Sequence, residues 1–189
     1  MASGTTLIGL GKPPAPGDAV ELLLECHGRI RSFLALARRL AEAREETPEA
    51  LADAALRVHR YFTLALPLHA RDEEESIVPR LRGREPALDV ALDAMAREHA
   101  EHQAPLGVLV TACAEVAGDP GRLAHLAGSL AGATGELERH FVVHLGREEE
   151  VVFPAVRQLL DGAADAAIVR ELRLRRGVVA AGGAAAPSS

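Results

Sequence analysis

The feature that most constrains this chain is a motif near its C-terminal end that occurs a second time 75 residues earlier. The later copy reads His144-Leu-Gly-Arg-Glu148-Glu-Glu-Val-Val-Phe-Pro154, and the earlier copy reads His69-Ala-Arg-Asp-Glu73-Glu-Glu-Ser-Ile-Val-Pro79. Each copy places a His four residues before a run of three Glu and ten residues before a Pro. Because residues four apart lie on one face of an α-helix, each copy predicts a helix that carries an imidazole and a carboxylate side by side.

Apolar residues recur at helical spacing through four long segments, and the second and fourth of these contain the two motifs. The predicted helices run from residue 18 to about residue 45, from residue 47 through residue 77, from residue 88 through residue 113, and from residue 123 to about residue 162. Asp18 and Thr47 are the expected N-caps of the first two helices, and Pro67 and Pro79 should bend or locally break the second. Four amphipathic helices with short connections predict an all-α, up-down-up-down four-helix bundle with a short extra C-terminal helix.

The predicted helices divide the chain into four parts. We expect an extended leader over residues 1–17, the bundle over residues 18–160, the short helix over residues 161–176 and a disordered tail over residues 177–189. The composition agrees with helices packed through aliphatic side chains, because 48% of the residues are hydrophobic and only 3% are aromatic.

Charge and hydropathy exclude several classes of protein. The formal net charge of −6 argues against binding to a nucleic-acid backbone. No apolar run approaches the roughly 20 residues that a membrane span needs, and the N-terminus lacks the basic region of a secretory signal. We therefore predict a cytoplasmic protein. Cys26 and Cys113 are too few for a disulfide framework, and Cys26 is expected to act as a small buried apolar side chain rather than as a redox thiol.

Polar side chains interrupt the predicted core of every helix. Burying a carboxylate without a counter-charge costs free energy. Two divalent cations with a bridging hydroxide would balance the negative charges of Glu73 and Glu148. Imidazoles and carboxylates without a thiolate suit iron, manganese or zinc rather than calcium or magnesium. Because more than four ligands converge, two bridged, redox-active ions fit better than a structural zinc, and iron is the most natural choice. His102 shares the face of His99 and His140 lies on the stripe of His144, so both are further candidates whose role stays open.

In these residues the chain resembles the hemerythrin family, in the bacterial hemerythrin-like branch with its repeated His-x-x-x-Glu and downstream aliphatic-Phe-Pro. The resemblance covers roughly residues 18–160. It implies a four-helix bundle around an oxo- or hydroxo-bridged non-haem di-iron centre, with bridging carboxylates from the second and fourth helices and histidines from all four. Carried onto this sequence, it nominates as metal ligands His27, His69, Glu73, His99, His144 and Glu148.

The chain departs from the family pattern in three places. His144 and Glu148 are four residues apart, as in the hemerythrin-like branch, whereas classical hemerythrins separate these two ligands by five. Cys26 stands where the residue before the first His is often acidic, although Glu98 keeps that feature before His99. His102 follows His99 by three residues, whereas classical hemerythrins place a second His after four. The remaining Glu of each run, Glu74 and Glu75 with Glu149 and Glu150, rotate off the inward face and are expected to be solvated.

The leading functional prediction is a protein that binds or senses O₂ or a related small oxidant such as NO or peroxide. A sensor would act through a separate protein partner. The sequence leaves two alternatives open at the same centre: an enzyme that decomposes peroxide or reduces NO, with His102, His140 or Tyr61 as proton donor, and a protein that stores or delivers iron. A helical bundle without metal is the remaining interpretation, and chelators would not change its stability.

Overall fold

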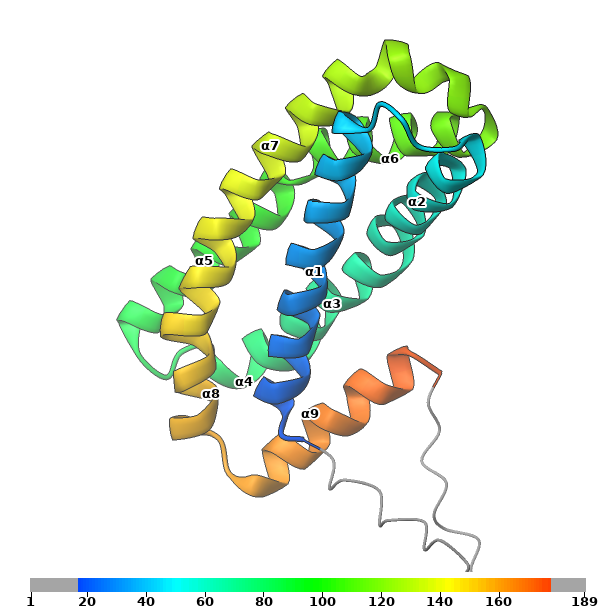
Figure 1. The fold of residues 1–189 in the computed structure, drawn as a ribbon. Coiled ribbons are helices and arrows are strands. Elements are labelled where there is room, and N and C mark those ends of the chain that lie inside the picture. The colour runs from blue at the N-terminus through cyan, green and yellow to red at the C-terminus, as the bar shows by residue number, and fades with distance from the viewer. Residues whose placement is uncertain (1–16, 178–189) are drawn as a thin grey trace, which may run out of the picture.

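The computed structural model describes residues 17–177, and that part of the chain consists of helices and their connections, without a strand (Figure 1). The predicted all-helical fold is confirmed, while the up-down-up-down order of exactly four helices stays a prediction. The expected leader and tail lie almost entirely outside the described residues. No helix within residues 17–177 is long and apolar enough to cross a membrane.

The helices form long columns, most of which contain short irregular turns. The first column is α1 (Ala19–Glu42). The second consists of α2 (Pro48–Arg60), the π-helical turn η1 (Tyr61–Ala65), α3 (Leu66–Asp72), the π-helical turn η2 (Glu73–Ile77) and α4 (Val78–Leu81). The third consists of α5 (Pro86–Glu101) and α6 (Gln103–Gly118), followed by the 3₁₀ turn η3 (Pro120–Arg122). The fourth consists of α7 (Leu123–Arg147), the π-helical turn η4 (Glu148–Val152) and α8 (Phe153–Leu159), and α9 (Gly162–Arg175) follows it.

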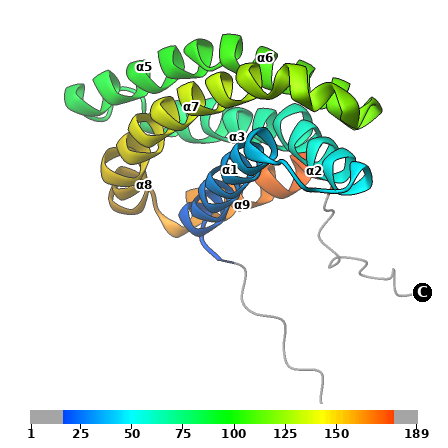
Figure 2. The same cartoon turned by 45° about the horizontal axis from the view of Figure 1, so that its top comes forward.

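These columns close into a bundle. α1 packs against α2 and α7, and α6 packs against the same two helices from the other side (Figures 1 and 2). α9 lies outside this ring and contacts α1, α3 and η2. The capping residues that the sequence predicts set the first two helices, because the Asp18 side chain accepts a hydrogen bond from the Glu21 N–H and the Thr47 side chain accepts one from the Ala50 N–H. α1 ends at Glu42, three residues before the predicted end.

A π-helical turn precedes each of three prolines in the columns. In η1, η2 and η4 the closing N–H bonds the carbonyl five residues back, and Pro67, Pro79 and Pro154 each follow two residues after the turn. Proline lacks an N–H and its ring clashes with the carbonyl four residues earlier, so a widened turn relieves both problems. The disturbance expected at Pro67 and Pro79 therefore takes the form of a π turn, and the same turn before Pro154 was not predicted.

The third predicted helix is interrupted where the sequence pattern is most regular. α5 ends at Glu101 and α6 begins at Gln103, so His102 lies at the break. Pro105 explains the break, since it cannot donate a hydrogen bond to the Glu101 carbonyl. The prediction of one continuous helix here was wrong because it gave no weight to this proline.

A buried polar layer divides the apolar core into two clusters. The larger cluster contains Ile30, Leu66 and Leu145, and the smaller one contains Leu23 and Ile77. Along α1 the two clusters are separated by His27, and along the second column they are separated by His69 and Glu73. The clusters thus enclose the polar layer between two aliphatic regions.

Candidate metal centre

Six buried or nearly buried polar residues from all four columns converge in this layer. They form two groups of four that share the same two carboxylates, and in each group one ligand atom per residue lies within 4.8 Å of the others. The first group adds two imidazoles to the shared carboxylates, and the second group adds two others. In order, the groups are His27, His69, Glu73 and Glu148, and Glu73, His99, His144 and Glu148. All six residues nominated as ligands from the sequence are therefore brought together.

The Glu73 carboxylate lies between two imidazoles from different columns. Its Oε1 is 3.2 Å from Nε2 of His69, and its Oε2 is 3.3 Å from Nε2 of His99. Glu73 is the first residue of η2 and is fully buried. One oxygen of the Glu73 carboxylate therefore faces an imidazole of the first group, and the other oxygen faces an imidazole of the second group.

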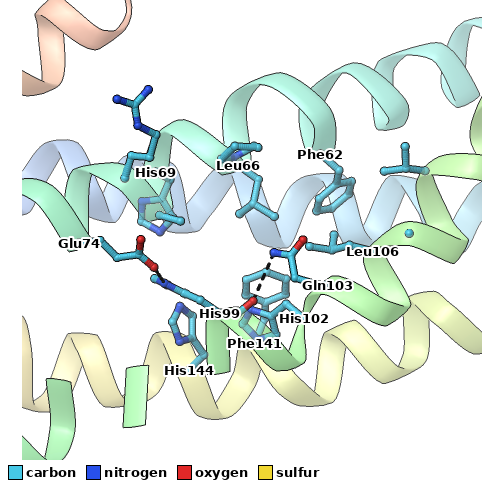
Figure 3. Close-up of a pocket in the computed structure, with 15 residues that line it drawn as sticks. Phe62, Leu66, His69, Glu74, His99, His102, Gln103, Leu106, Phe141 and His144 are labelled. Carbon is cyan, nitrogen blue, oxygen red and sulfur yellow. Dashed lines mark hydrogen bonds and ion pairs between the residues drawn. The ribbon is translucent and has the colours of Figure 1, made fainter. Parts of the chain in front are cut away.

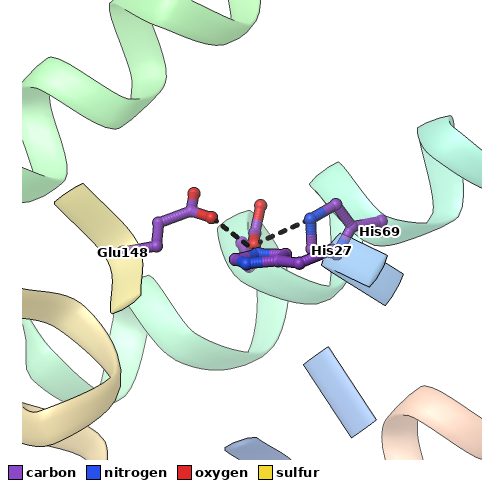
Figure 4. A group of neighbouring side chains, drawn as sticks. His27, His69 and Glu148 are labelled. Atoms are coloured by element: carbon purple, nitrogen blue, oxygen red, sulfur yellow. Dashed lines mark ion pairs between the residues drawn. The ribbon is translucent and has the colours of Figure 1, made fainter. Parts of the chain in front are cut away.

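Glu148 repeats this arrangement from the fourth column. Its Oε2 is 3.0 Å from Nε2 of His27, and its Oε1 is 3.1 Å from Nε2 of His144. Figure 4 shows the side chains of Glu148, His27 and His69 directed toward one another. Like Glu73, Glu148 opens a π-helical turn and is fully buried. The two carboxylates are thus placed to bridge the two groups.

The donor atoms of this layer fit metal cations. Both oxygens of Glu73 and Glu148, and Nε2 of His27 and His69, have no hydrogen-bond partner among the described residues, although they lie close to one another. Two donors that each lie about 2.1 Å from one ion are roughly 3.0 to 3.4 Å apart at ordinary coordination angles. The nitrogen–oxygen distances of 3.0 to 3.3 Å at both carboxylates match this separation.

Burial shifts the protonation of these groups away from their charged forms. Desolvation raises the pKa of the Glu148 carboxyl to about 8, with the nearby Glu73 carboxyl as a further cause, and it raises the pKa of Glu73 well above its ordinary value. Desolvation also lowers the pKa of His144 to about 3 and the pKa of His69 well below its ordinary value. Neutral imidazoles are ready to act as ligands, and a divalent cation would favour the ionised carboxylates.

Comparison with known proteins agrees with this geometry. The hemerythrin HHE cation-binding domain matches residues 18–121, more than half of the chain. The chain belongs to the hemerythrin family. The predicted resemblance is confirmed, and cation binding by such a domain agrees with the two ligand groups. No curated protein matches the chain. Because the family match ends in η3, the placement of His144 and Glu148 in this hemerythrin rests on the structure.

Three of the four imidazoles in the ligand groups form a hydrogen bond through Nδ1 with a carboxylate that lies outside these groups. The Nδ1 atom of His27 lies 2.7 Å from Oε1 of Glu149, and Nδ1 of His99 lies 2.7 Å from Oε1 of Glu74. A proton on Nδ1 that is donated to a carboxylate leaves Nε2 free to bind a metal and orients the ring. The expectation of solvated side chains is confirmed for Glu74, which is exposed, whereas Glu149 is half-buried, and neither hydrogen bond to an imidazole was predicted. Both residues do turn off the inward face, but their side chains reach an imidazole on a neighbouring column.

The signal that could have found these two residues was present in the sequence. Both copies of the motif contain the complete run of three Glu, and Glu74 and Glu149 occupy the same place in it.

The third contact between an imidazole and a carboxylate outside the ligand groups involves Glu98. Nδ1 of His144 lies 3.1 Å from Oε2 of Glu98, whose other oxygen accepts a hydrogen bond from Arg147. Glu98 is the acidic residue directly before His99, a position that is often acidic in the family pattern.

The fourth imidazole, His69, differs from the other three. Its Nδ1 is buried and has no hydrogen-bond partner within residues 17–177. The first and third helices repeat as well, with His27 and His99 as equivalent residues 72 positions apart, and this alignment places Cys26 at the position of Glu98. Cys26 is half-buried, and its Sγ accepts a hydrogen bond from Arg176 at 3.8 Å. Cys26 is therefore not the apolar core residue that was expected, although burial raises the pKa of its thiol.

Helix α9 and the residue after it cover this side of the site. The fully buried Asp72 accepts hydrogen bonds from Arg175 at 2.8 Å and from Arg176 at 2.5 Å, and Arg175 also donates to Ser76. The internal repeat aligns Asp72 with Arg147. In the first half the residue at this position is therefore a carboxylate paired with arginines, whereas in the second half it is an arginine paired with the Glu98 carboxylate.

The three remaining candidates lie outside both ligand groups. His102 is 3% exposed, stacks on Phe141 with ring centroids 4.3 Å apart, and has an Nε2 without a hydrogen-bond partner in the described part of the chain. His140 is half-buried, and its ring centroid is 5.7 Å from that of His102. The Tyr61 hydroxyl donates to the Cys26 carbonyl at 3.4 Å.

A cavity of about 450 Å³ extends from the imidazoles toward the surface. His69, His99 and His144 line one end, and Phe62 and Leu106 line the other (Figure 3). His27 does not line the cavity. The second ligand group therefore contributes both of its imidazoles to the cavity wall, and the first group contributes one.

Proposed function

We propose that this chain holds two iron ions, bridged by Glu73 and Glu148, and binds or senses O₂ or a related small oxidant such as NO or peroxide. The observation that carries the proposal is the orientation of the two carboxylates. Each directs one oxygen toward an imidazole of the first group and its other oxygen toward an imidazole of the second group. His27 and His69 would complete one ion's ligands, and His99 and His144 would complete those of the other.

The donor set favours iron over the alternatives. Imidazole and carboxylate ligands suit iron, manganese and zinc, and a structural zinc site is usually complete with four ligands on a single ion. Two ferrous ions can together supply two electrons, which is the number that reduces O₂ to the level of peroxide.

The surrounding residues would control access to the centre. The two aliphatic clusters exclude water above and below the polar layer. The cavity gives a small molecule a path to the imidazoles of His99 and His144. Glu74, Glu98 and Glu149 hold the ligand rings in the orientation that directs Nε2 inward.

Metal analysis after anaerobic addition of Fe(II) tests this proposal. We expect about two iron ions per chain, and optical spectra that change when O₂, peroxide or NO is added. Glu73→Gln and Glu148→Gln keep the shape of the side chain but remove its charge, so each should reduce the bound iron. Glu150→Gln is the matched control, because Glu150 is the exposed last member of the same run. One iron or none in the unmodified chain would contradict the proposal.

A second candidate function is an enzyme that decomposes peroxide or reduces NO at the same centre. The observation that favours it is the buried His102, whose unpartnered Nε2 belongs to a residue lining the cavity. A group in this position could exchange a proton with a bound oxidant. Repeated turnover with added reductant would support the enzyme, whereas a stable adduct that is released on lowering the oxidant would support the binding protein.

A further inference from the structure

The cavity beside the candidate metal centre is much larger than a diatomic ligand requires. Its volume is about 450 Å³, whereas one water molecule occupies about 30 Å³ of the liquid. Pockets that bind organic molecules in proteins span roughly 300 to 1,000 Å³. The cavity is therefore large enough to hold a small organic molecule and not only a diatomic ligand of the metals.

The walls of the cavity change character along its length. The end away from the histidines is lined mainly by the apolar side chains of Phe62, Leu66 and Leu106, with the Gln103 amide beside Leu106 (Figure 3). Val110 and Phe141 extend this apolar surface. Such a wall favours a ligand with a compact hydrocarbon body, because each apolar group that leaves water contributes to binding.

One residue of the cavity wall has a buried nitrogen atom that lacks a partner. Nε2 of His102 makes no hydrogen bond within residues 17–177, and the side chain is 3% exposed and stacks on Phe141. Buried polar atoms are rarely left without a partner, since each costs free energy. A ligand with a hydroxyl or hydroperoxyl head could supply a hydrogen-bond partner for this nitrogen.

The charges near the cavity favour an uncharged head group. The guanidinium of Arg71 is engaged by Glu75 at 2.8 Å, and the Glu74 carboxylate on the cavity wall is engaged by His99. A carboxylate ligand would therefore find no uncommitted cation on the wall and would meet an acidic residue. A neutral oxygen-bearing head meets neither difficulty.

We propose that the cavity binds an organic hydroperoxide, with its hydrocarbon body against Phe62, Leu66 and Leu106 and its oxygen-bearing head toward His102. The choice of a hydroperoxide rests on the proposed function, because the head would lie beside the residues that hold the redox-active ions. Binding itself depends only on the cavity. It can therefore be measured without any redox reaction.

The test uses the full chain loaded with zinc, which is redox-inert, and 2-phenylpropan-2-ol, the alcohol that corresponds to cumene hydroperoxide. Titration followed by NMR or calorimetry should show saturable binding with one alcohol per chain. Isopropylbenzene, which lacks the hydroxyl, should bind about fivefold to tenfold more weakly, as expected for the loss of one hydrogen bond.

Two variants locate the ligand. Gly107 lines the cavity, and a Cβ added there meets no atom within 4 Å, so Gly107→Leu should occupy the space without strain and weaken binding at least tenfold. Gly128→Leu is the matched control on α7, because Gly128 is equally open and does not line the cavity. His102→Phe keeps the ring against Phe141 and should remove the preference for the alcohol over isopropylbenzene.

The outcomes separate this inference from the proposed function. A chain that holds two zinc ions but shows no saturable binding of the alcohol overturns the inference and leaves the metal centre intact. Binding that Gly107→Leu and His102→Phe leave unchanged also overturns it, because the alcohol would then lie elsewhere. Saturable binding that both variants weaken supports the inference, even if the chain fails to hold two ions.

Discussion

Glu98 accepts a hydrogen bond from Nδ1 of His144 at 3.1 Å, although the two residues lie in different columns of the bundle. Arg147 donates to the other oxygen of Glu98 at 2.8 Å, so the carboxylate is held from two sides. The internal repeat places Cys26 at the equivalent position of the first half, where the buried Nδ1 of His69 has no partner among the described residues. The two proposed ions would therefore have unequal surroundings.

Replacing Glu98 should weaken one metal site and spare the other. Glu98→Gln removes the charge that orients His144, and the loss of such an outer partner typically reduces metal affinity about tenfold to a hundredfold. A stepwise zinc titration should then show one weakened binding step and one step of unchanged affinity. Glu101→Gln is the control, because Glu101 is exposed on the same helix. Equal weakening of both steps, or of neither, would contradict this role.

The attachment of α9 gives a second prediction, which concerns stability. Asp72 is fully buried and binds Arg175 and Arg176, so Asp72→Ala removes the buried carboxylate that these two partly buried guanidinium groups share. We expect the free energy of unfolding to fall by about 2 to 4 kcal/mol, as is typical when one partner of a buried ion pair is removed. Urea denaturation measures the change. Asp53→Ala removes an exposed carboxylate that pairs with Arg57, and should cost less than about 1 kcal/mol.

The pairing of His and Glu in the candidate metal centre could be predicted from the sequence because it follows from helical spacing. A His and a Glu four residues apart must share a helix face, and the same spacing in two copies made coincidence improbable. The side-chain contacts of Glu74 and Glu149 could not be predicted in this way. They depend on how far each column stands from its neighbour, which no periodicity within one helix determines.

The same limit explains the errors in the helices and at Cys26. Periodicity predicts which residues face inward but not where a backbone hydrogen bond is lost, so the break at His102 and the π turn at Glu148 were missed. Cys26 was interpreted from its own residue type. Its actual neighbour, Arg176, follows a helix that lies outside the bundle and 150 residues further along the chain.

Proton release gives a third prediction. Desolvation raises the pKa of Glu148 to about 8 and raises that of Glu73 well above its ordinary value, so protons and cations compete for both carboxylates. Metal binding at pH 7 should therefore release protons, and the apparent affinity should rise as the pH increases from 6 toward 9. Zinc titrations in buffers of different ionisation enthalpy count the protons. Glu148→Gln should reduce the number released, whereas Glu150→Gln should not. Release that does not depend on Glu148 would contradict the prediction.

The last prediction concerns the stability of the chain in acid. Desolvation lowers the pKa of His102 to about 4, with His99 as a further cause, whereas the unfolded chain binds the same proton with a pKa near 6.5. Between these values the unfolded state holds more protons than the folded state, so the contribution of His102 to stability falls as the pH drops from 6.5 to 4.

His102→Phe removes this titration and keeps the aromatic contact with Phe141. The variant should gain about 2 kcal/mol relative to the unmodified protein between pH 7 and pH 4, after allowance for solvent screening. Urea denaturation at several pH values, with chelator present so that metal release does not contribute, measures the difference. His125→Phe alters an exposed histidine and should leave the pH profile unchanged. A difference between His102→Phe and the unmodified protein that is the same at every pH would show that His102 takes up its proton as easily in the folded state as in the unfolded one.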